Sequence, residues 1–172
     1  MSVPVVSRNE VLKQFHRLQK TGFEHRLETA AAANGLPAPF VFAIASRETN
    51  CTNELGDKRD GVFHGVGIMQ IDIQHQIARD ARDSGSWKTH PQPLIDFGAR
   101  LLAQNVAAVK AHFPAFDEHQ HLKIAASGYN CGVQRAIDGA NAGDSDLHTT
   151  GGDYGADVMD RMAKFEAILA GA

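Results

Sequence analysis

Residues 39–49 have the sequence Pro-Phe-Val-Phe-Ala-Ile-Ala-Ser-Arg-Glu-Thr, an apolar run that ends in a charged pair. The pattern predicts a helix that begins near Pro39 and continues to Glu48. Phe40, Ile44 and Glu48 are spaced four residues apart, so they share one face of this helix. A glutamate that continues an apolar face is unusual, because a charged carboxylate loses much free energy when it leaves water.

Burial of Glu48 would raise the pKa of its carboxyl group, because desolvation disfavours the charged form. Its place near the C-terminal end of the helix, the negative pole, acts in the same direction. A carboxylic acid that stays protonated near neutral pH is what general acid catalysis requires. The spacing alone leaves a second interpretation open, in which Glu48 bends out to solvent or pairs with Arg47.

The rest of the chain is predicted to form helices separated by polar and glycine-rich loops. Further helices are predicted after the capping signal of residues 7–10, over 23–33, over 93–112, on a short segment up to 129, and from about 153. Between residues 50 and 72 the helical periodicity is lost and glycines recur, which indicates loops with a short hairpin. We therefore predict a mainly α (α+β) fold in one domain, with N-terminal helices in residues 1–36 packed on a core region of residues 37–172.

Composition limits the classes of protein that this chain can belong to. With 172 residues, 43% of them hydrophobic, it can bury one core. The net charge of -3 and the absence of a long single-sign run argue against a nucleic-acid partner. No apolar stretch approaches the roughly 20 residues that cross a bilayer, so membrane insertion is not expected. Residues 1–10 lack the basic segment followed by an apolar one that is typical of a signal peptide, so the sequence does not indicate an export route.

A general acid needs a second carboxylate, or a group of the substrate, to complete the reaction. The glycine-rich segment offers Asp57, Asp60 and Asp72. If residues 70–72 are extended, alternation directs Gln70 and Asp72 to the same side. Each aspartate taken alone has a plainer explanation as a turn or capping residue.

Four motifs in this sequence occur together in a known family. They are Ala45-Ser46-Arg47-Glu48-Thr49, Gly65-Val66-Gly67-Ile68-Met69-Gln70-Ile71-Asp72, Gly128-Tyr129-Asn130-Cys131-Gly132, and residues 149–161 with Asp153-Tyr154, Asp157-Val158 and Arg161. These motifs resemble the Ser-Arg-Glu-Ser, Gly-Leu-Met-Gln-Val-Asp, Ala-Tyr-Asn-Ala-Gly and closing Asp-Tyr motifs of goose-type lysozymes. Bacterial lytic transglycosylases are similar in three of the four.

The resemblance implies a lysozyme-like fold, in which a bundle of helices and a small β hairpin enclose a glycan groove. It implies an enzyme that cleaves the β-1,4 bond between N-acetylmuramic acid and N-acetylglucosamine in peptidoglycan, with Glu48 as the general acid. Asp72, and less securely Asp57, match the aspartates that position the attacking water in an inverting hydrolysis. The same resemblance implies that Gln70, Tyr129, Asn130 and Tyr154 lie in or beside the groove. His75 beside the glycine-rich segment is a further candidate contact to sugar.

The chain departs from the family pattern in one region. The segment between Glu48 and Asp57 is shorter than in typical members, and the segment from Asp57 to Gly65 is longer, so Asp60 could replace Asp57. A lytic transglycosylase, which forms 1,6-anhydro-muramyl products and needs one essential carboxyl, is the alternative function. Asp72 favours hydrolysis, since transglycosylases generally lack an acid at this place. A non-catalytic wall-binding module is the second alternative.

Several smaller expectations complete the prediction. The expected partners are peptidoglycan strands, and the expected place of action is the cell wall, outside the cell or in the periplasm. The protein is expected to be a monomer. Binding of an inhibitor protein is left open. No cofactor and no bound metal are expected, since His119-Gln120-His121 fits a solvated polar turn better than a zinc motif. Cys51 lies three residues after Glu48 and Cys131 directly follows Asn130, so the two form either a disulfide between neighbouring segments or two free thiols.

Overall fold

The computed structural model describes residues 5–171, which form nine helices and four short strands. The helices are α1 (Arg8–Thr21), α2 (Phe23–Ala33), α3 (Ala38–Thr49), α4 (Gln76–Ser84), α5 (Ser86–Thr89), α6 (Gln92–His112), α7 (Glu118–Cys131), α8 (Val133–Asn141) and α9 (Tyr154–Leu169). The strands are β1 (Lys58–Arg59), β2 (Val62–Phe63), β3 (Gly65–Val66) and β4 (Ile71–Asp72). The prediction of a mainly α fold is confirmed. The first four residues, on which part of the signal-peptide expectation depends, lie outside the described residues.

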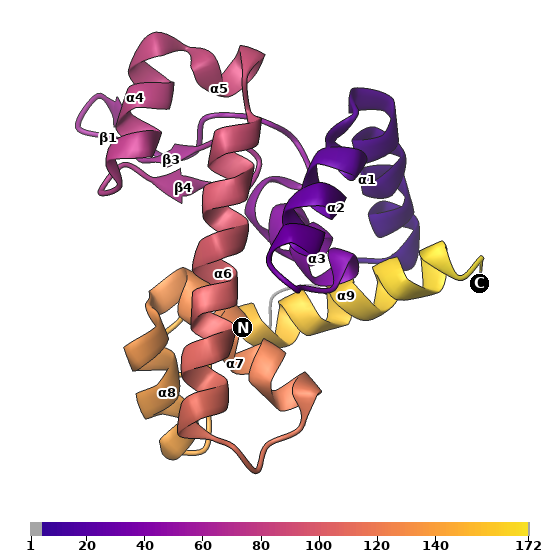
Figure 1. Ribbon diagram of the computed structural model, residues 1–172, viewed down its shortest axis with the longest axis vertical. Helices are drawn as coiled ribbons and strands as arrows, with labels where there is room; N and C mark the ends of the chain where they lie inside the picture. The colour runs from indigo at the N-terminus through magenta and orange to yellow at the C-terminus, as the bar shows by residue number, and fades with distance from the viewer. Residues whose placement is uncertain (1–4, 172) are drawn as a thin grey trace.

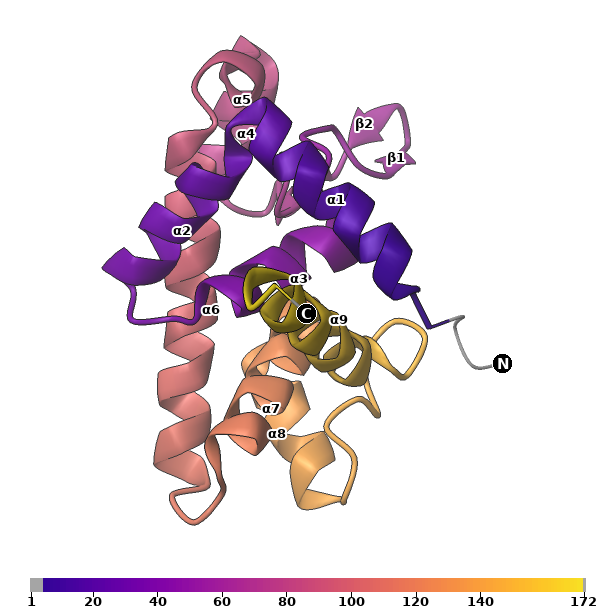
Figure 2. The ribbon, with the colours of Figure 1, turned by 90° about the vertical axis from the view of Figure 1, so that its right-hand side faces the viewer.

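The helix α6 runs the length of the molecule and connects its two ends (Figure 1). The strands lie with α4 and α5 at one end of α6, and α7 and α8 lie at the other. The helix α3 is central, since every residue from Phe40 to Ser46 is buried, and it packs against α2 and α9. Figure 2 shows α3 and α9 from the side on which the C-terminus lies.

Three aromatic rings hold the N-terminal helices to the centre. Phe15 of α1, Phe42 of α3 and Phe165 of α9 have ring centroids 5.6–6.3 Å apart. Aromatic rings tilted or edge-on at this spacing contribute about 0.5–1.5 kcal/mol beyond the area they bury. The start of α1 is fixed by Ser7, whose hydroxyl accepts a hydrogen bond from the Glu10 amide at 3.1 Å, as the capping signal predicted. The apolar residues of α1 and α2 therefore belong to the same core as α3.

The glycine-rich segment forms the expected hairpin. β1 pairs with β2, and β3 with β4, in antiparallel register. Asp60 and Gly61 have φ of 49° and 80°, the left-handed values of the two-residue turn that best fits the twist of a hairpin. Gln70 and Asp72 were predicted to point to the same side only if residues 70–72 are extended. Gln70 is not extended, since its φ of 50° places it in a turn before β4.

Other predicted elements differ in detail. The segment around residues 117–121 is no solvated turn but the start of α7, where Asp117 and Gln120 form a capping box. His121 is buried, with its Nε2 2.8 Å from the Phe113 carbonyl oxygen. The helix α8 was not predicted at all.

Within residues 5–171, no helix is both long enough and apolar enough to span a membrane.

Candidate active site

A cleft of about 700 Å³ opens beside the C-terminal end of α3. Three parts of the chain form its walls: the end of α3, the segment from residue 54 to residue 74 that contains the strands, and the end of α7 with the start of α9. Its lining includes Glu48, Asp57, Asp72, Gln70, Tyr129, Asn130 and Tyr154. The structure thus brings together seven of the eight residues that the sequence nominated, and they come from segments up to about a hundred residues apart.

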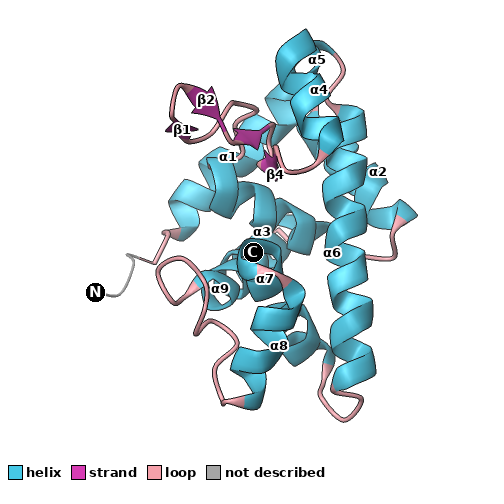
Figure 3. Cartoon of the chain, turned by 90° about the vertical axis from the view of Figure 1, so that its left-hand side faces the viewer, coloured by secondary structure: helices cyan, strands magenta, loops and turns pink. Residues whose placement is uncertain are grey.

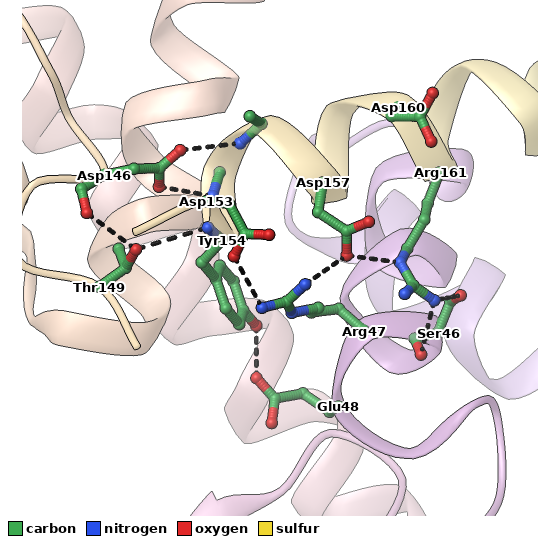
Figure 4. Close-up of polar contacts among 12 residues, drawn as sticks. Ser46, Arg47, Glu48, Asp146, Thr149, Asp153, Tyr154, Asp157, Asp160 and Arg161 are labelled. Atoms are coloured by element: carbon green, nitrogen blue, oxygen red, sulfur yellow. Dashed lines mark hydrogen bonds and ion pairs between the residues drawn. The ribbon is translucent and has the colours of Figure 1, made fainter. Parts of the chain in front are cut away.

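Glu48 lies in the last turn of α3, just before Asn50 ends the helix with a φ of 51°. Its Oε1 accepts a short hydrogen bond from the Tyr154 hydroxyl (Figure 4). Burial raises the pKa of the Glu48 carboxyl, although the hydrogen bond from Tyr154 and the charge of Arg47 act to lower it. Glu48 therefore combines a tendency to stay protonated with two groups that stabilise its anion once the proton has left.

Arg47 is not the partner of Glu48, so this part of the alternative interpretation is wrong. Its guanidinium instead binds Asp157 at 2.8 Å and Asp153 at 3.1 Å, and lies 5.3 Å from the centre of the Tyr154 ring. The hydroxyl of Tyr154 and the charge of Arg47 therefore act on Glu48 from one side. The other carboxylate oxygen, Oε2, has no hydrogen bond to any described residue (Figure 4).

Replacing Tyr154 by Phe removes the hydrogen bond that lowers the pKa of Glu48, so that pKa should rise further. A general acid works only while protonated, and its protonated fraction falls as the pH rises through its pKa. The alkaline limb of kcat/KM against pH should therefore move to higher pH, with kcat reduced about tenfold or less. Tyr129→Phe is the matched control, since the Tyr129 hydroxyl bonds to the Met69 carbonyl instead. A shift of the limb to lower pH, or an equal shift in the control, would contradict this role of Tyr154.

An ionic network joins the C-terminal end of α3 to α9. Oδ2 of Asp157 accepts from Arg47 at 2.8 Å and from Arg161 at 2.7 Å, and Arg161 continues to the carbonyl and hydroxyl of Ser46 (Figure 4). Arg161 is only 7% exposed, so its charge depends on Asp157 for compensation. The network fixes the turn that carries Glu48 relative to Tyr154.

Because Asp157 is shared by two arginines, Asp157→Asn should leave a buried cation without its anionic partner. We expect a loss of about 3–5 kcal/mol in the free energy of unfolding, measured by urea denaturation. Asp160→Asn is the control on the same helix, since Asp160 pairs only with Lys164 near the surface and should cost about 1 kcal/mol or less. Equal losses in the two variants would show that the network does not stabilise the fold.

The position of Tyr154 depends on Asp146, which the sequence did not indicate. The Asp146 carboxylate accepts from the amides of Gly155 at 2.6 Å and Ala156 at 3.0 Å, and from the Ser127 hydroxyl at 2.8 Å. It therefore caps the start of α9 from outside the helix. A Cβ at Gly155 would lie 2.3 Å from the Ser127 hydroxyl oxygen, so the close approach of α9 to α7 requires glycine there.

Asp57 and Asp72 lie on the wall formed by the strands. Asp72 is exposed in β4, where its Oδ1 accepts from the Gln74 amide at 2.7 Å. Asp57 is also exposed, with 83% of its side chain accessible, and lies 3.6 Å from the Arg59 guanidinium. Asp57 lines the cleft, whereas Asp60 lies in the hairpin turn outside the lining. The geometry thus favours Asp57 over Asp60 as the second aspartate.

Two of the groove candidates hold the cleft wall in shape. Gln70 donates to the carbonyl oxygens of Glu54 at 3.2 Å and Gly67 at 2.9 Å, and its Oε1 fills the space where Gly56 or Gly65 would carry a Cβ. The Tyr129 hydroxyl donates to the Met69 carbonyl at 2.9 Å, and burial raises the pKa of this hydroxyl well above its usual value. Contact with the Gln70 side chain therefore explains the glycines at 56 and 65, whereas Gly67 is explained by its left-handed φ of 82°.

Of the remaining candidates, Asn130 lines both the main cleft and an adjoining cavity, and His75 lines the adjoining cavity alone. Asn130 accepts at 2.8 Å from the amide of Thr150, which fixes the loop before α9. His75 does not line the main cleft. It lines an adjoining cavity of about 440 Å³, with its ring 4.9 Å from that of Phe97. The two cavities share Gln70, Asp72, Gln74, Tyr129 and Asn130, so they are direct neighbours.

The cysteines are free thiols rather than a disulfide. Cys51 is buried, which raises the pKa of its thiol to about 12. Cys131 is half-buried and lines the adjoining cavity. In the part of the chain that the structure describes, no group of three or more His, Cys, Asp or Glu side chains could hold a metal ion.

Comparison with known proteins agrees with the motifs and the fold. The family model described as "Lysozyme g" matches residues 9–167. The lysozyme g of Takifugu rubripes is 32% identical over 133 residues, which cover 76% of this chain and 67% of the relative. That of Epinephelus coioides is 27% identical over 146 residues (81% and 72%), and that of Cyprinus carpio 25% over 145 residues (84% and 73%).

Proposed function

The chain belongs to the lysozyme g family, and from this premise we propose that it hydrolyses peptidoglycan with inversion, using Glu48 as the general acid. Family membership makes it a lysozyme, a glycoside hydrolase. The bond cut in this proposal is the β-1,4 bond between N-acetylmuramic acid and N-acetylglucosamine. The observation that carries the proposal is the partly buried Glu48 carboxyl, which faces a cleft that also contains two exposed aspartates.

In the first part of the reaction, protonated Glu48 gives its proton to the glycosidic oxygen. The bond between that oxygen and the anomeric carbon then breaks, and the electron pair stays on the leaving oxygen. The anion left on Glu48 is stabilised by the Tyr154 hydroxyl and by the positive charge of Arg47. The free Oε2 is suited to deliver the proton, because Tyr154 fixes the carboxyl group through Oε1 alone.

In the second part, a water molecule attacks the anomeric carbon from the opposite face of the sugar ring. We assign its positioning and deprotonation to Asp72, with Asp57 beside it. Inverting enzymes hold the acid and the base about 6.5–9.5 Å apart, which leaves room for this water. Both aspartates are exposed and line the same cleft as Glu48, which supports this assignment.

The glycan strand is proposed to lie along the groove past Gln70, Tyr129, Asn130 and Tyr154, with His75 at its far part. A peptidoglycan substrate places the action of the protein at a cell wall, outside the cell or in the periplasm. A monomer suffices for this chemistry, because all residues assigned to it come from one chain. Binding of an inhibitor protein stays an untested prediction.

Analysis of the products tests the proposed reaction. Digestion of purified peptidoglycan in H₂¹⁸O should give reducing ends that carry one ¹⁸O atom, and early NMR spectra should show the α-anomer, since the β bond is inverted. Products that end only in 1,6-anhydro-muramyl groups would overturn hydrolysis in favour of a lytic transglycosylase. Binding to walls without any cleavage would identify a wall-binding module instead.

A further inference from the structure

The β1–β2 hairpin brings a cation to the edge of the cleft. Arg59 lines the cleft, and 67% of its side chain is exposed. Neighbouring residues of a strand point to opposite faces, and Lys58 accordingly lies over the ring of Phe63, 5.4 Å from its centre. Arg59 is therefore the basic residue of this hairpin that faces the space for the substrate.

The hairpin is a built arm rather than a loose loop. Its ladder continues past β1 and β2 through the hydrogen bond from the His64 amide to the Asp57 carbonyl at 2.9 Å, and its turn has the left-handed geometry described above. Arg82 of α4 donates to the Phe63 carbonyl at 3.3 Å and ties the arm to the body of the protein. The arm projects from the molecule at the end that contains α4 and α5 (Figures 1 and 3). The backbone of Arg59 thus has a fixed place at the cleft.

The charges around the cleft leave Arg59 as the group that can bind an anionic part of the substrate. Carboxylates of Glu54, Asp57 and Asp72 line the cleft and would repel an anionic substrate. The other arginine of the lining, Arg47, is engaged by two aspartates. Arg59 has only the exposed pair with Asp57 at 3.6 Å, and exposed pairs of this kind are weak. Among the described residues of the lining, Arg59 is the arginine that can take a carboxylate from outside.

We propose that Arg59 binds a carboxylate on the 3-O-lactyl arm of a muramic acid residue in the cleft, and so makes the enzyme prefer anionic strands. The inference rests on the proposed function, which supplies this substrate. The planar guanidinium can form two parallel hydrogen bonds to a carboxylate, which suits it to this role better than an ammonium group. The carboxylate belongs either to the lactyl group itself or to a peptide attached to it.

The test compares glycan strands with and without their carboxylates. Soluble strands are used as prepared, or after carbodiimide coupling to methylamine, which removes the charge and leaves the glycosidic bonds unchanged. The wild type should show a kcat/KM about tenfold higher on the anionic strands, and Arg59→Gln should reduce this preference nearly to one. Arg59→Lys should keep part of it. Lys58→Gln removes the same charge from the other face of the hairpin and should keep all of it.

Each result has a defined meaning. A wild type without preference, or an Arg59→Gln variant that loses activity equally on both sets of strands, would overturn the inference while the proposed function stands. No cleavage of any strand by the wild type would overturn both. The comparison of anionic and methylamidated strands is made once with peptide-free strands and once with peptide-bearing strands. The preference should appear only in the set that has the recognised carboxylate, which shows whether that carboxylate belongs to the lactyl group or to the peptide.

Discussion

Glu48→Gln is expected to reduce the turnover of peptidoglycan by about 10²–10⁴-fold, the range that a positioned general acid contributes. Glutamine has nearly the same shape and can still accept the hydrogen bond of Tyr154 through its amide oxygen. It has no proton to give to the leaving oxygen, so the cleavage step loses its acid while the cleft keeps its form. Turbidity of a cell-wall suspension and release of reducing ends both measure the loss.

The stability of the same variant gives an independent check. Burial raises the folded-state pKa of Glu48 above its unfolded value, so its contribution to stability is fully present below the unfolded pKa and is lost as the pH rises through the folded pKa. Glutamine does not ionise and avoids this loss. Glu48→Gln should therefore be at least as stable as the wild type at mildly alkaline pH, measured by urea denaturation.

The control is Glu166→Gln, the same chemical change at an exposed residue of α9, which should leave activity unchanged. Retained activity in Glu48→Gln would remove Glu48 from its proposed role. A variant that is inactive and also much less stable would contradict the expectation that the residue serves chemistry at the expense of stability.

The parts of the fold that local sequence determines were predictable. The helix α3 follows from its apolar run, and the start of α1 from a cap that lies three residues from its partner. The helix α8 was missed because it is short and has Gly132 before it and Gly139 inside it, a composition typical of loops. Gly139 is required there by tertiary contact, since a Cβ would lie 2.5 Å from the Asp144 carbonyl oxygen. Nothing in the local sequence reports that contact.

The same distinction applies to the site. The position of Glu48 on an apolar face was visible locally, and the motifs supplied its neighbours in the cleft. The partners of Arg47 are 106 and 110 residues away, so an adjacent pair such as Arg47 and Glu48 suggested an ion pair that does not form. Alternation would direct Gln70 and Asp72 to the same side only if the stretch were extended, whereas the left-handed φ of Gln70 turns its side chain over two glycines. Ion pairs between residues far apart in the chain, and left-handed backbone angles at residues other than glycine, cannot be predicted from a single sequence.

Asp72→Asn should reduce hydrolysis by a similar factor of about 10²–10⁴, because the attacking water loses the base that takes its proton. Asparagine can still accept the hydrogen bond from the Gln74 amide, so the turn after β4 should be kept. A transglycosylase uses a hydroxyl of the substrate instead of water and would lose far less. Asp57→Asn should cost less than Asp72→Asn, and Asp60→Asn, at a turn residue outside the cleft lining, is the matched control.

Rescue by azide separates a chemical role of Asp72 from a structural one. Azide is an anion that attacks without losing a proton, so it does not need a base. In Asp72→Asn it should restore cleavage and give a glycosyl azide of inverted configuration, because Glu48 still protonates the leaving oxygen. In Glu48→Gln it should restore nothing, since the leaving oxygen then has no proton donor. Failure of azide in Asp72→Asn, with the fold intact, would contradict the assignment of Asp72 as the base. If only Asp57→Asn responded to azide, the roles of the two aspartates would be reversed, and the base would lie beside Arg59 at the root of the hairpin.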